Sequence, residues 1–211
     1  QDEEGKEQEQ EEEQEEEAGA SIPVGFEQVV TMFPMDFEEW LWANGVETQH
    51  IDYLRDCMEK EIPVNEAFHQ RMHQLLLRYV VVGGMPEAVS SFFETNNMGD
   101  VWEVQHGIVE TYKADMLKYA LQEDKSRIRE CFESIPAQLA KENKKFQYAI
   151  VRKGARSRDY QGSLQWIEDA GIVHRCHNTT ITELPLSGNA IPDMFKVYMA
   201  DIGLLVSMLE E

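Results

Sequence analysis

The sequence is poor in cationic residues and has no long apolar run. Its 211 residues include 19 Lys and Arg against 40 Asp and Glu, which gives a formal net charge of −21 at pH 7. A chain of this charge is repelled by nucleic acid and by anionic membranes, which excludes a protein that coats either without selectivity. No stretch approaches the roughly 18 apolar residues of a membrane-spanning helix, and the first residues lack the order of a signal peptide. We therefore expect a cytoplasmic protein without a membrane segment.

Cysteine is scarce and scattered. Cys57, Cys131 and Cys176 are odd in number, far apart and never in a C-x-x-C pair, which favours reduced structural thiols over a disulfide or zinc framework. His69 and His73 have the i, i+4 spacing that can hold zinc, but they lack the glutamate of H-E-x-x-H and a third nearby ligand. We therefore predict no metal site, and no spacing of nucleophile and base identifies a catalytic residue.

The charge is distributed unevenly along the chain. Residues 1–17 contain 11 acidic residues and one lysine, and such a block cannot bury apolar surface, so we expect a disordered acidic tail over residues 1–20. Residues 125–158 contain 10 basic and 3 acidic residues, a local charge of +7. A cationic segment therefore lies within an anionic protein. The total charge does not exclude a local contact between this segment and DNA.

The first half of the chain beyond the tail is expected to be helical. A short β-prone run at residues 29–31 is followed by Pro34 and by a helix for which Asp36 is the predicted N-cap. Residues 36–124 then show helical periodicity interrupted at Pro63, at Gly83-Gly84 and near residues 96–99. Two sets of residues at helical spacing are predicted to form buried faces: Leu75, Leu76, Tyr79 and Val82, and Ile108, Tyr112, Met116 and Tyr119.

The second half has the pattern of a winged helix-turn-helix. A helix begins near Ser126 and is kinked or restarted at Pro136, and a second helix is expected between Ser157 and Gly171. The strings IVHRC and FKVYM alternate as strands do and can pair as an antiparallel ribbon. We therefore predict a mostly α fold, in which a helical domain is followed by a winged helix with a short β-ribbon.

Long strings in both halves carry a family resemblance. The strings FPMDFEEWLWANG, YVVVGGMPEAV, SIPAQLAKENKKFQYAIVRKGARSRDY, GIVHR and FKVYMADIGLL resemble the C-terminal two-thirds of a bacterial and archaeal family of AAA-type ATP-binding proteins. In that family an ATPase core precedes a helical lid, a winged helix and a nuclease-like domain. The resemblance implies that residues 21–35 form the last core strand, residues 36–124 the lid and residues 125–211 the winged helix.

The resemblance also implies ATP and Mg²⁺ as cofactors of the complete protein, and the ATPase core and the nuclease-like domain as partners of this chain. However, the sequence contains no G-x-x-x-x-G-K-[ST] string, whose backbone N–H groups and lysine are needed to hold phosphates. We therefore interpret the chain as a lid and winged-helix portion that does not hydrolyse ATP alone. A freestanding DNA-binding module and a non-catalytic adaptor with an acidic tail are the alternatives.

Two groups of residues are candidates for binding. Gly83, Gly84, Met85 and Pro86 resemble the lid turn that packs on adenine in related ATPases, with Arg78 as a phosphate contact. The alternative is a helix–helix turn with a C-terminal glycine and an N1 proline that needs no ligand. The second group is a cationic surface whose possible partner is double-stranded DNA. The alternatives are that this surface docks on an acidic protein surface or is simply solvated. Its predicted residues are Lys144, Lys145, Arg152, Lys153, Arg156, Arg158, Gln161 and Arg175, with Ser163 also facing outward.

Overall fold

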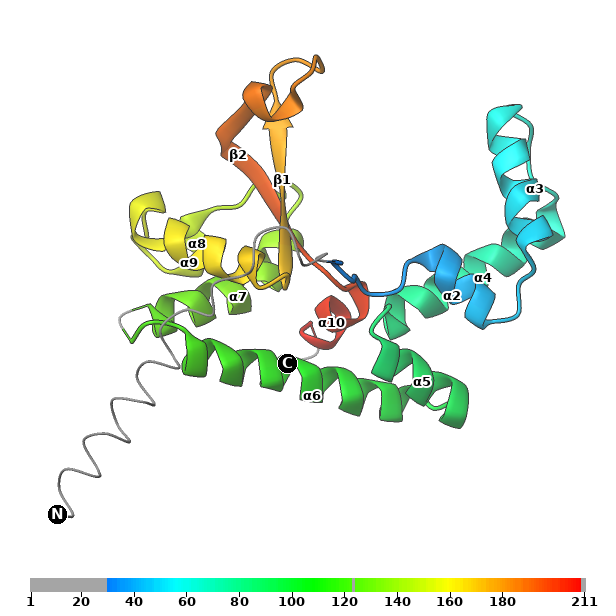
Figure 1. Ribbon diagram of the computed structural model, residues 1–211, viewed down its shortest axis with the longest axis horizontal. Helices are drawn as coiled ribbons and strands as arrows, with labels where there is room; N and C mark the ends of the chain where they lie inside the picture. Colours follow the sequence, from blue (N-terminus) through cyan, green and yellow to red (C-terminus); the bar gives the residue numbers. More distant parts are fainter. Residues whose placement is uncertain (1–29, 123, 210–211) are drawn as a thin grey trace, which may run out of the picture. The chain divides into compact units, whose positions relative to one another are not determined.

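The computed structural model describes residues 30–122 and 124–209 (Figure 1). The predicted acidic tail at residues 1–20 lies outside the described residues. The chain divides after Met32, and residues from Phe33 onward form one compact unit. Within the described part, no helix is both long enough and apolar enough to cross a membrane.

The compact unit is mostly helical and contains one two-stranded antiparallel sheet, which confirms the predicted fold class. The first half holds α2 (Phe37–Ala43), α3 (Thr48–Glu59), α4 (Glu66–Val82), α5 (Pro86–Thr95) and α6 (Met98–Tyr119). The second half holds α7 (Lys125–Leu139), α8 (Tyr148–Val151), α9 (Ser157–Asp169), β1 (Val173–Thr179), a 3-10 turn η1 (Leu186–Asn189), β2 (Ala190–Met199) and α10 (Ile202–Ser207).

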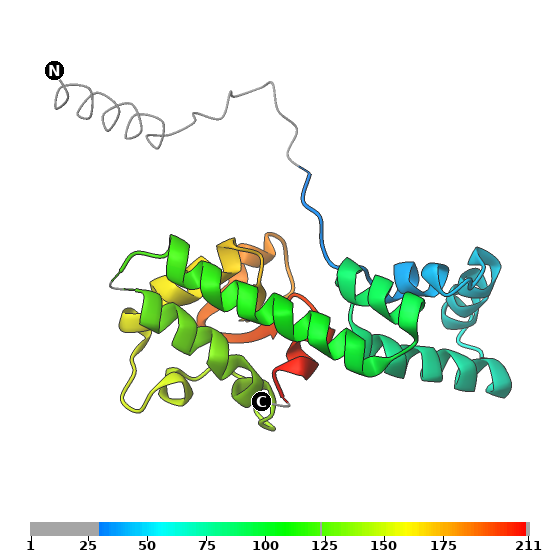
Figure 2. The same ribbon diagram turned by 90° about the horizontal axis from the view of Figure 1, so that it is seen from below.

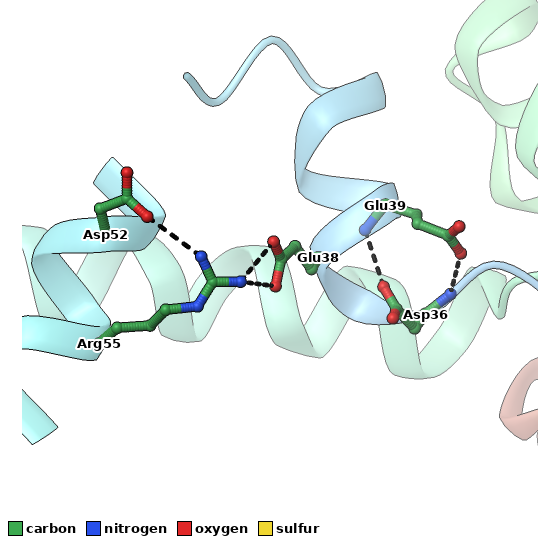
Figure 3. Close-up of polar contacts among 5 residues, drawn as sticks. All are labelled: Asp36, Glu38, Glu39, Asp52 and Arg55. Atoms are coloured by element: carbon green, nitrogen blue, oxygen red, sulfur yellow. Dashed lines mark hydrogen bonds and ion pairs between the residues drawn. The ribbon is translucent and has the colours of Figure 1, made fainter. Parts of the chain in front are cut away.

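The start of α2 is fixed by a capping box, as the sequence predicted for Asp36. The Asp36 carboxylate accepts from the Glu39 N–H at 2.8 Å, and the Glu39 carboxylate accepts from the Asp36 N–H at 2.9 Å (Figure 3). These two bonds satisfy N–H groups that the first turn of a helix otherwise leaves free. Figure 3 also shows Arg55 of α3, which pairs with Glu38 at 2.6 Å and so connects α3 to α2.

The β-prone run before α2 does not form a strand in its described part. Val30 is 73% exposed and Met32 89% exposed, and residues 30–36 have no regular secondary structure. A strand needs a neighbouring strand to receive its backbone hydrogen bonds, and the sheet of the described residues consists of β1 and β2. Apolar side chains therefore remain in water on a segment with β propensity.

The breaks between α4, α5 and α6 follow the predicted turn residues. The Asn65 side chain caps α4, and Gly83 ends that helix with a φ of +74°. Pro86 is the first residue of α5, and Asn96 ends it in the left-handed region with a φ of +48°. Proline at a first helical position and glycine or asparagine just past a last one are the favoured arrangements.

Two apolar cores share α6, which is the long green helix of Figures 1 and 2. Val101 near its start packs with α2, α4 and α5, whereas Val109 and Met116 pack with α7, α9 and the ribbon. The two cores thus meet along α6. Two predicted buried positions are wrong, because Leu76 is 40% and Tyr119 is 65% exposed; the buried stripe of α6 follows Val101, Gln105, Val109, Lys113 and Met116 instead.

The second half has the element order predicted for a winged helix. Helix α7 continues through Pro136 to Leu139 without a restart. The buried face of α9 consists of Tyr160, Leu164 and Ile167, as predicted. Strands β1 and β2 pair antiparallel from Val173↔Met199 to His177↔Phe195, which places Val173, Val197 and Phe195 in the core and leaves the alternate residues in solvent.

Candidate functional site

The glycine turn between α4 and α5 is hydrogen-bonded to the start of α10, more than a hundred residues later in the chain. Asp201 accepts from the Gly84 N–H through Oδ2 at 2.6 Å. Its other oxygen, Oδ1, accepts from the Leu204 N–H at 2.9 Å and so caps α10. One buried carboxylate therefore joins the turn to the helix that follows β2.

The close approach of these segments requires glycine at three positions. A Cβ on Gly83 would lie 2.3 Å from Asp201 Oδ1, and one on Gly84 would lie 2.0 Å from the Met35 carbonyl oxygen. A Cβ on Gly203 would lie 2.5 Å from the Gln105 Nε2 atom and 2.6 Å from the Val82 carbonyl oxygen. Because all of these distances are far below van der Waals contact, the junction excludes any side chain at the three glycines.

Further hydrogen bonds attach the segment before α2 and helix α6 to the same junction. The Met35 N–H donates to the Gly84 carbonyl at 2.8 Å, and the Tyr79 hydroxyl donates to the Met35 carbonyl at 2.9 Å. The Gln105 side chain donates to the carbonyls of Val81 and Val82 at 2.8 and 2.9 Å. Those carbonyls belong to the last turn of α4, which has no intrahelical donors for them.

The electrostatics of the junction are dominated by burial of Asp201, which is 3% exposed. Loss of hydration raises the pKa of the Asp201 carboxyl above its ordinary value, and the N–H groups of Gly84 and Leu204 oppose that rise. Burial also raises the pKa values of the Tyr79 and Tyr112 hydroxyls, with the charge of Asp201 as the second cause. The Asp201 carboxylate is therefore stabilised by backbone N–H groups.

The predicted nucleotide-contact residues separate into two groups. Gly83 and Gly84 are buried, and the Gly84 N–H and carbonyl are both bonded within the chain, so this turn has the arrangement that needs no ligand. Met85 is half-buried, whereas Pro86 and Arg78 are exposed. Of the predicted nucleotide-contact residues, Met85, Pro86 and Arg78 therefore remain accessible to solvent.

The cationic surface is formed by the start of α9 and the turn before it. Arg156, Arg158 and Gln161 are exposed, as predicted. Arg158 lies on the side of α9 opposite Tyr160, and Arg156 is the N-cap residue before the helix. Arg158 lies 3.6 Å from Asp159 and Arg152 lies 3.7 Å from Glu130; both arginines remain more than 70% exposed. Within residues 30–122 and 124–209, Lys144, Lys153 and Arg156 have no carboxylate at ion-pair distance.

Two predicted outward residues are used inside the fold instead. The Arg175 guanidinium donates to Glu168 at 2.5 Å and to Gln165, and only 13% of its side chain is exposed. The pairing fastens β1 to α9, so Arg175 does not offer its charge to a phosphate. Ser163 is buried on the inner face of α9, because it lies one helical turn after Tyr160.

The cysteines and the paired histidines are the remaining side chains with reactive or metal-binding chemistry. Cys57 and Cys131 are buried, and burial raises the pKa of the Cys131 thiol to about 12, whereas Cys176 is exposed. The His69 and His73 rings stack with centroids 6.3 Å apart. In the part of the chain that is described, no group of three or more His, Cys, Asp or Glu side chains is placed to hold a metal ion.

Sequence reasoning missed Asp201 and Gln105, which organise the junction. Asp201 is one of 40 acidic residues, and nothing in its local pattern indicates burial against a turn formed by residues 83 and 84. A usable signal was its position directly before Ile202-Gly203, where an aspartate is a favoured N-cap and a glycine permits close approach.

Searches of curated proteins and of solved structures find no match to the chain. A family model with the description "Domain of unknown function (DUF8612)" matches residues 73–211. This match covers more than half of the chain, and it includes the glycine turn, Asp201 and the cationic surface. The chain therefore belongs to the DUF8612 family, a domain of unknown function.

Proposed function

We propose that this chain is the lid and winged-helix portion of an AAA-type ATP-binding protein. In this proposal an ATPase core holds the nucleotide and the present chain responds to it. The observation that carries the proposal is the Asp201 junction, in which one carboxylate bonds the glycine turn of the lid-like half and caps α10 after the ribbon. A displacement of the turn would therefore be transmitted to α10 and β2.

The segment before α2 supports the same proposal. Val30, Met32 and Phe33 are exposed apolar residues on a β-prone segment without a neighbouring strand among the described residues. The family resemblance assigns this segment to the edge of an ATPase core. A sheet in that position would receive its backbone hydrogen bonds and cover its side chains.

Contact with ATP on this chain is assigned to the exposed residues beside the junction. Met85 and Pro86 offer apolar surface to a planar adenine ring, and Arg78 offers a cation to a phosphate. Mg²⁺ and the phosphate-binding loop belong to the core. Since the chain supplies only the lid side of such a site, its own affinity for ATP should be weak.

Titration of ATP·Mg²⁺ into ¹⁵N-labelled chain tests the proposal. We expect saturation only at millimolar ATP, with the largest amide shifts at Met85, Glu87 and Arg78. Arg78→Ala should weaken binding by about tenfold, because a charge-assisted contact is lost. Arg71→Ala, on the same helix and equally exposed, should leave the affinity unchanged.

Other outcomes of the titration would contradict the proposal. Micromolar affinity, or phosphate release abolished by EDTA, would show a complete nucleotide site in this chain. Shifts spread over the surface, or equal weakening by Arg78→Ala and Arg71→Ala, would remove Met85, Pro86 and Arg78 from the nucleotide site.

A second candidate function is binding of double-stranded DNA, and a specific observation favours it. Arg158 and Gln161 are exposed in the first turns of α9, and Arg156 is exposed directly before it. The proposed winged helix uses α9 as the second helix of its helix-turn-helix. In that arrangement the start of the second helix enters the major groove while nearby cations contact phosphates. Lys153, which is exposed and has no ion pair among the residues that the structure describes, adds to this surface.

The salt dependence of duplex binding tests this second function. The log of the affinity should fall linearly with the log of the salt concentration, and Arg158→Ala should reduce the slope by about 1 for a lost phosphate contact. Arg71→Ala removes the same charge on α4 and should not change the slope. Absence of gel retardation at low salt, or equal effects of the two substitutions, would exclude a DNA-binding surface at α9.

A further inference from the structure

A pocket of about 410 Å³ lies beside the ribbon, apart from the glycine turn and from α9. It is bounded by the loop between α7 and α8, by β1 and by β2, which all appear in Figure 1. Small-molecule sites in proteins commonly enclose about 300–1,000 Å³, so the pocket has the size of a ligand site.

The loop wall of the pocket is held in place by bonds and by ring packing. The Phe146 N–H donates to the Phe195 carbonyl at 2.9 Å, and the two rings stack with centroids 5.7 Å apart. Gln138 and Gln147 exchange two hydrogen bonds of 2.9 and 3.0 Å, which fix the end of the loop to α7. The loop therefore stands at a defined distance from β2, and the pocket is largely preformed.

The charges around the pocket are of one sign, although the chain as a whole is strongly acidic. Lys145 from the loop and Lys196 from β2 line it, together with His177 and the amides of Asn143 and Asn178. None of the described residues that line it is acidic. Within the described ranges, Lys145 and Lys196 have no carboxylate at ion-pair distance. Two ammonium groups and two amides thus offer hydrogen-bond donors to an anion.

The remaining lining is apolar or aromatic. Met194, Phe195 and Tyr198 contribute to the wall, and Met194 and Tyr198 are each more than a third exposed. Exposed apolar side chains beside unpaired cations suit a ligand that has an apolar or planar part as well as a charged group.

We propose that this pocket binds a small organic phosphate. The phosphate is neutralised by Lys145 and Lys196, and the organic part lies against Met194 and Tyr198. A dianionic phosphate matches the two lysine charges. This site uses neither the glycine turn nor α9, and of the predicted DNA-contact residues it includes Lys145.

Cys176 provides a reporter within the pocket. It lines the pocket and is exposed, whereas Cys57 and Cys131 are buried. The neutral reagent N-ethylmaleimide should therefore react at Cys176 first, with the site verified by peptide mass. The rate of this reaction is measured in the full chain with increasing phenyl phosphate, and with inorganic phosphate as the probe without an organic part.

We expect saturable protection of Cys176 by phenyl phosphate. Inorganic phosphate should protect about tenfold less well, because it makes no apolar contact. Lys196→Glu should weaken protection by about tenfold or more, and Lys145→Gln should weaken it with a smaller change of charge. Lys118→Glu has the same charge change on an exposed lysine outside the pocket, and phenyl phosphate should protect Cys176 in this variant as well as in the unmodified chain.

Three results would overturn the proposal. They are absence of protection at millimolar phenyl phosphate, equal weakening by Lys196→Glu and Lys118→Glu, and equal protection by the two probes. The first result would show that the pocket binds no organic phosphate. The second would show that the effect comes from the overall charge of the chain, and the third that the organic part of the ligand makes no contact. An unchanged melting temperature for Lys145→Gln verifies that the pocket is intact in that variant.

Discussion

Replacing Gly84 by alanine should strain the junction between the glycine turn and the segment before α2. The added Cβ would lie 2.0 Å from the Met35 carbonyl oxygen and 2.8 Å from the Met35 nitrogen. Both atoms belong to backbone, which cannot rotate away as a side chain does. The Met35 segment must therefore move, and its hydrogen bond of 2.8 Å to the Gly84 carbonyl must lengthen or break.

The cost of this substitution follows from those two effects. Forcing a methyl group into a close-packed site costs about 1–3 kcal/mol, and loss of a hydrogen bond within a fold costs about 0.5–1.5 kcal/mol. We therefore expect Gly84→Ala to lower the free energy of unfolding by about 2–4 kcal/mol. For a domain of this size, such a change lowers the melting temperature by roughly 4–16 °C.

Urea unfolding measured by circular dichroism tests the expected loss, and Gly107→Ala is the matched control. Gly107 lies inside α6, and a Cβ there would have no atom within 4 Å. Alanine at that position should raise the free energy of unfolding by about 0.5–1 kcal/mol, because glycine is the poorer helix former. Equal effects of the two substitutions, or a Gly84→Ala chain as stable as the unmodified one, would refute the close packing of the turn.

Two further predictions concern Asp201 and Arg175. Burial raises the pKa of the Asp201 carboxyl, so the stability that its proton contributes is complete below about pH 4 and is lost as the pH rises through the folded-state pKa. Urea unfolding at several pH values should therefore show the unmodified chain losing stability relative to Asp201→Asn as the pH rises. A difference that stays constant with pH would contradict this. Arg175→Ala should lower the free energy of unfolding by about 1–3 kcal/mol, because Glu168 loses a charge-assisted partner, without weakening DNA binding in a gel shift; a stable variant that no longer binds DNA would reverse that assignment.

The local features of the fold were predictable because they depend on residues close in sequence. Asp36 caps α2, Gly83 ends α4 and Pro86 begins α5, as the turn residues indicated. The ribbon follows from alternating residues in two short strings. In contrast, the burial of α6 was misjudged at Tyr119, because two cores share this helix and its buried stripe is set by both.

The candidate sites were predictable only in part. The exposure of Arg158 follows from helical spacing, since the opposite face of α9 is apolar. Arg156 is the extended N-cap residue before α9, so helical spacing does not account for its exposure. The pairing of Arg175 with Glu168 depends on how β1 lies against α9. The hydrogen bond from Gly84 to Asp201 joins residues 117 positions apart. Such contacts depend on tertiary packing, which periodicity and turn chemistry do not specify.

Asp201 joins the glycine turn to α10, and we propose that this junction makes the two halves respond together. Amide hydrogen exchange in the Asp201→Ala chain measures what the junction holds. The Gly84 and Leu204 amides should both exchange at least about tenfold faster than in the unmodified chain, because both lose their acceptor, while the Val109 amide inside α6 should be unaffected. A Gly84 amide that stays protected in this variant would show that Asp201 does not hold the turn.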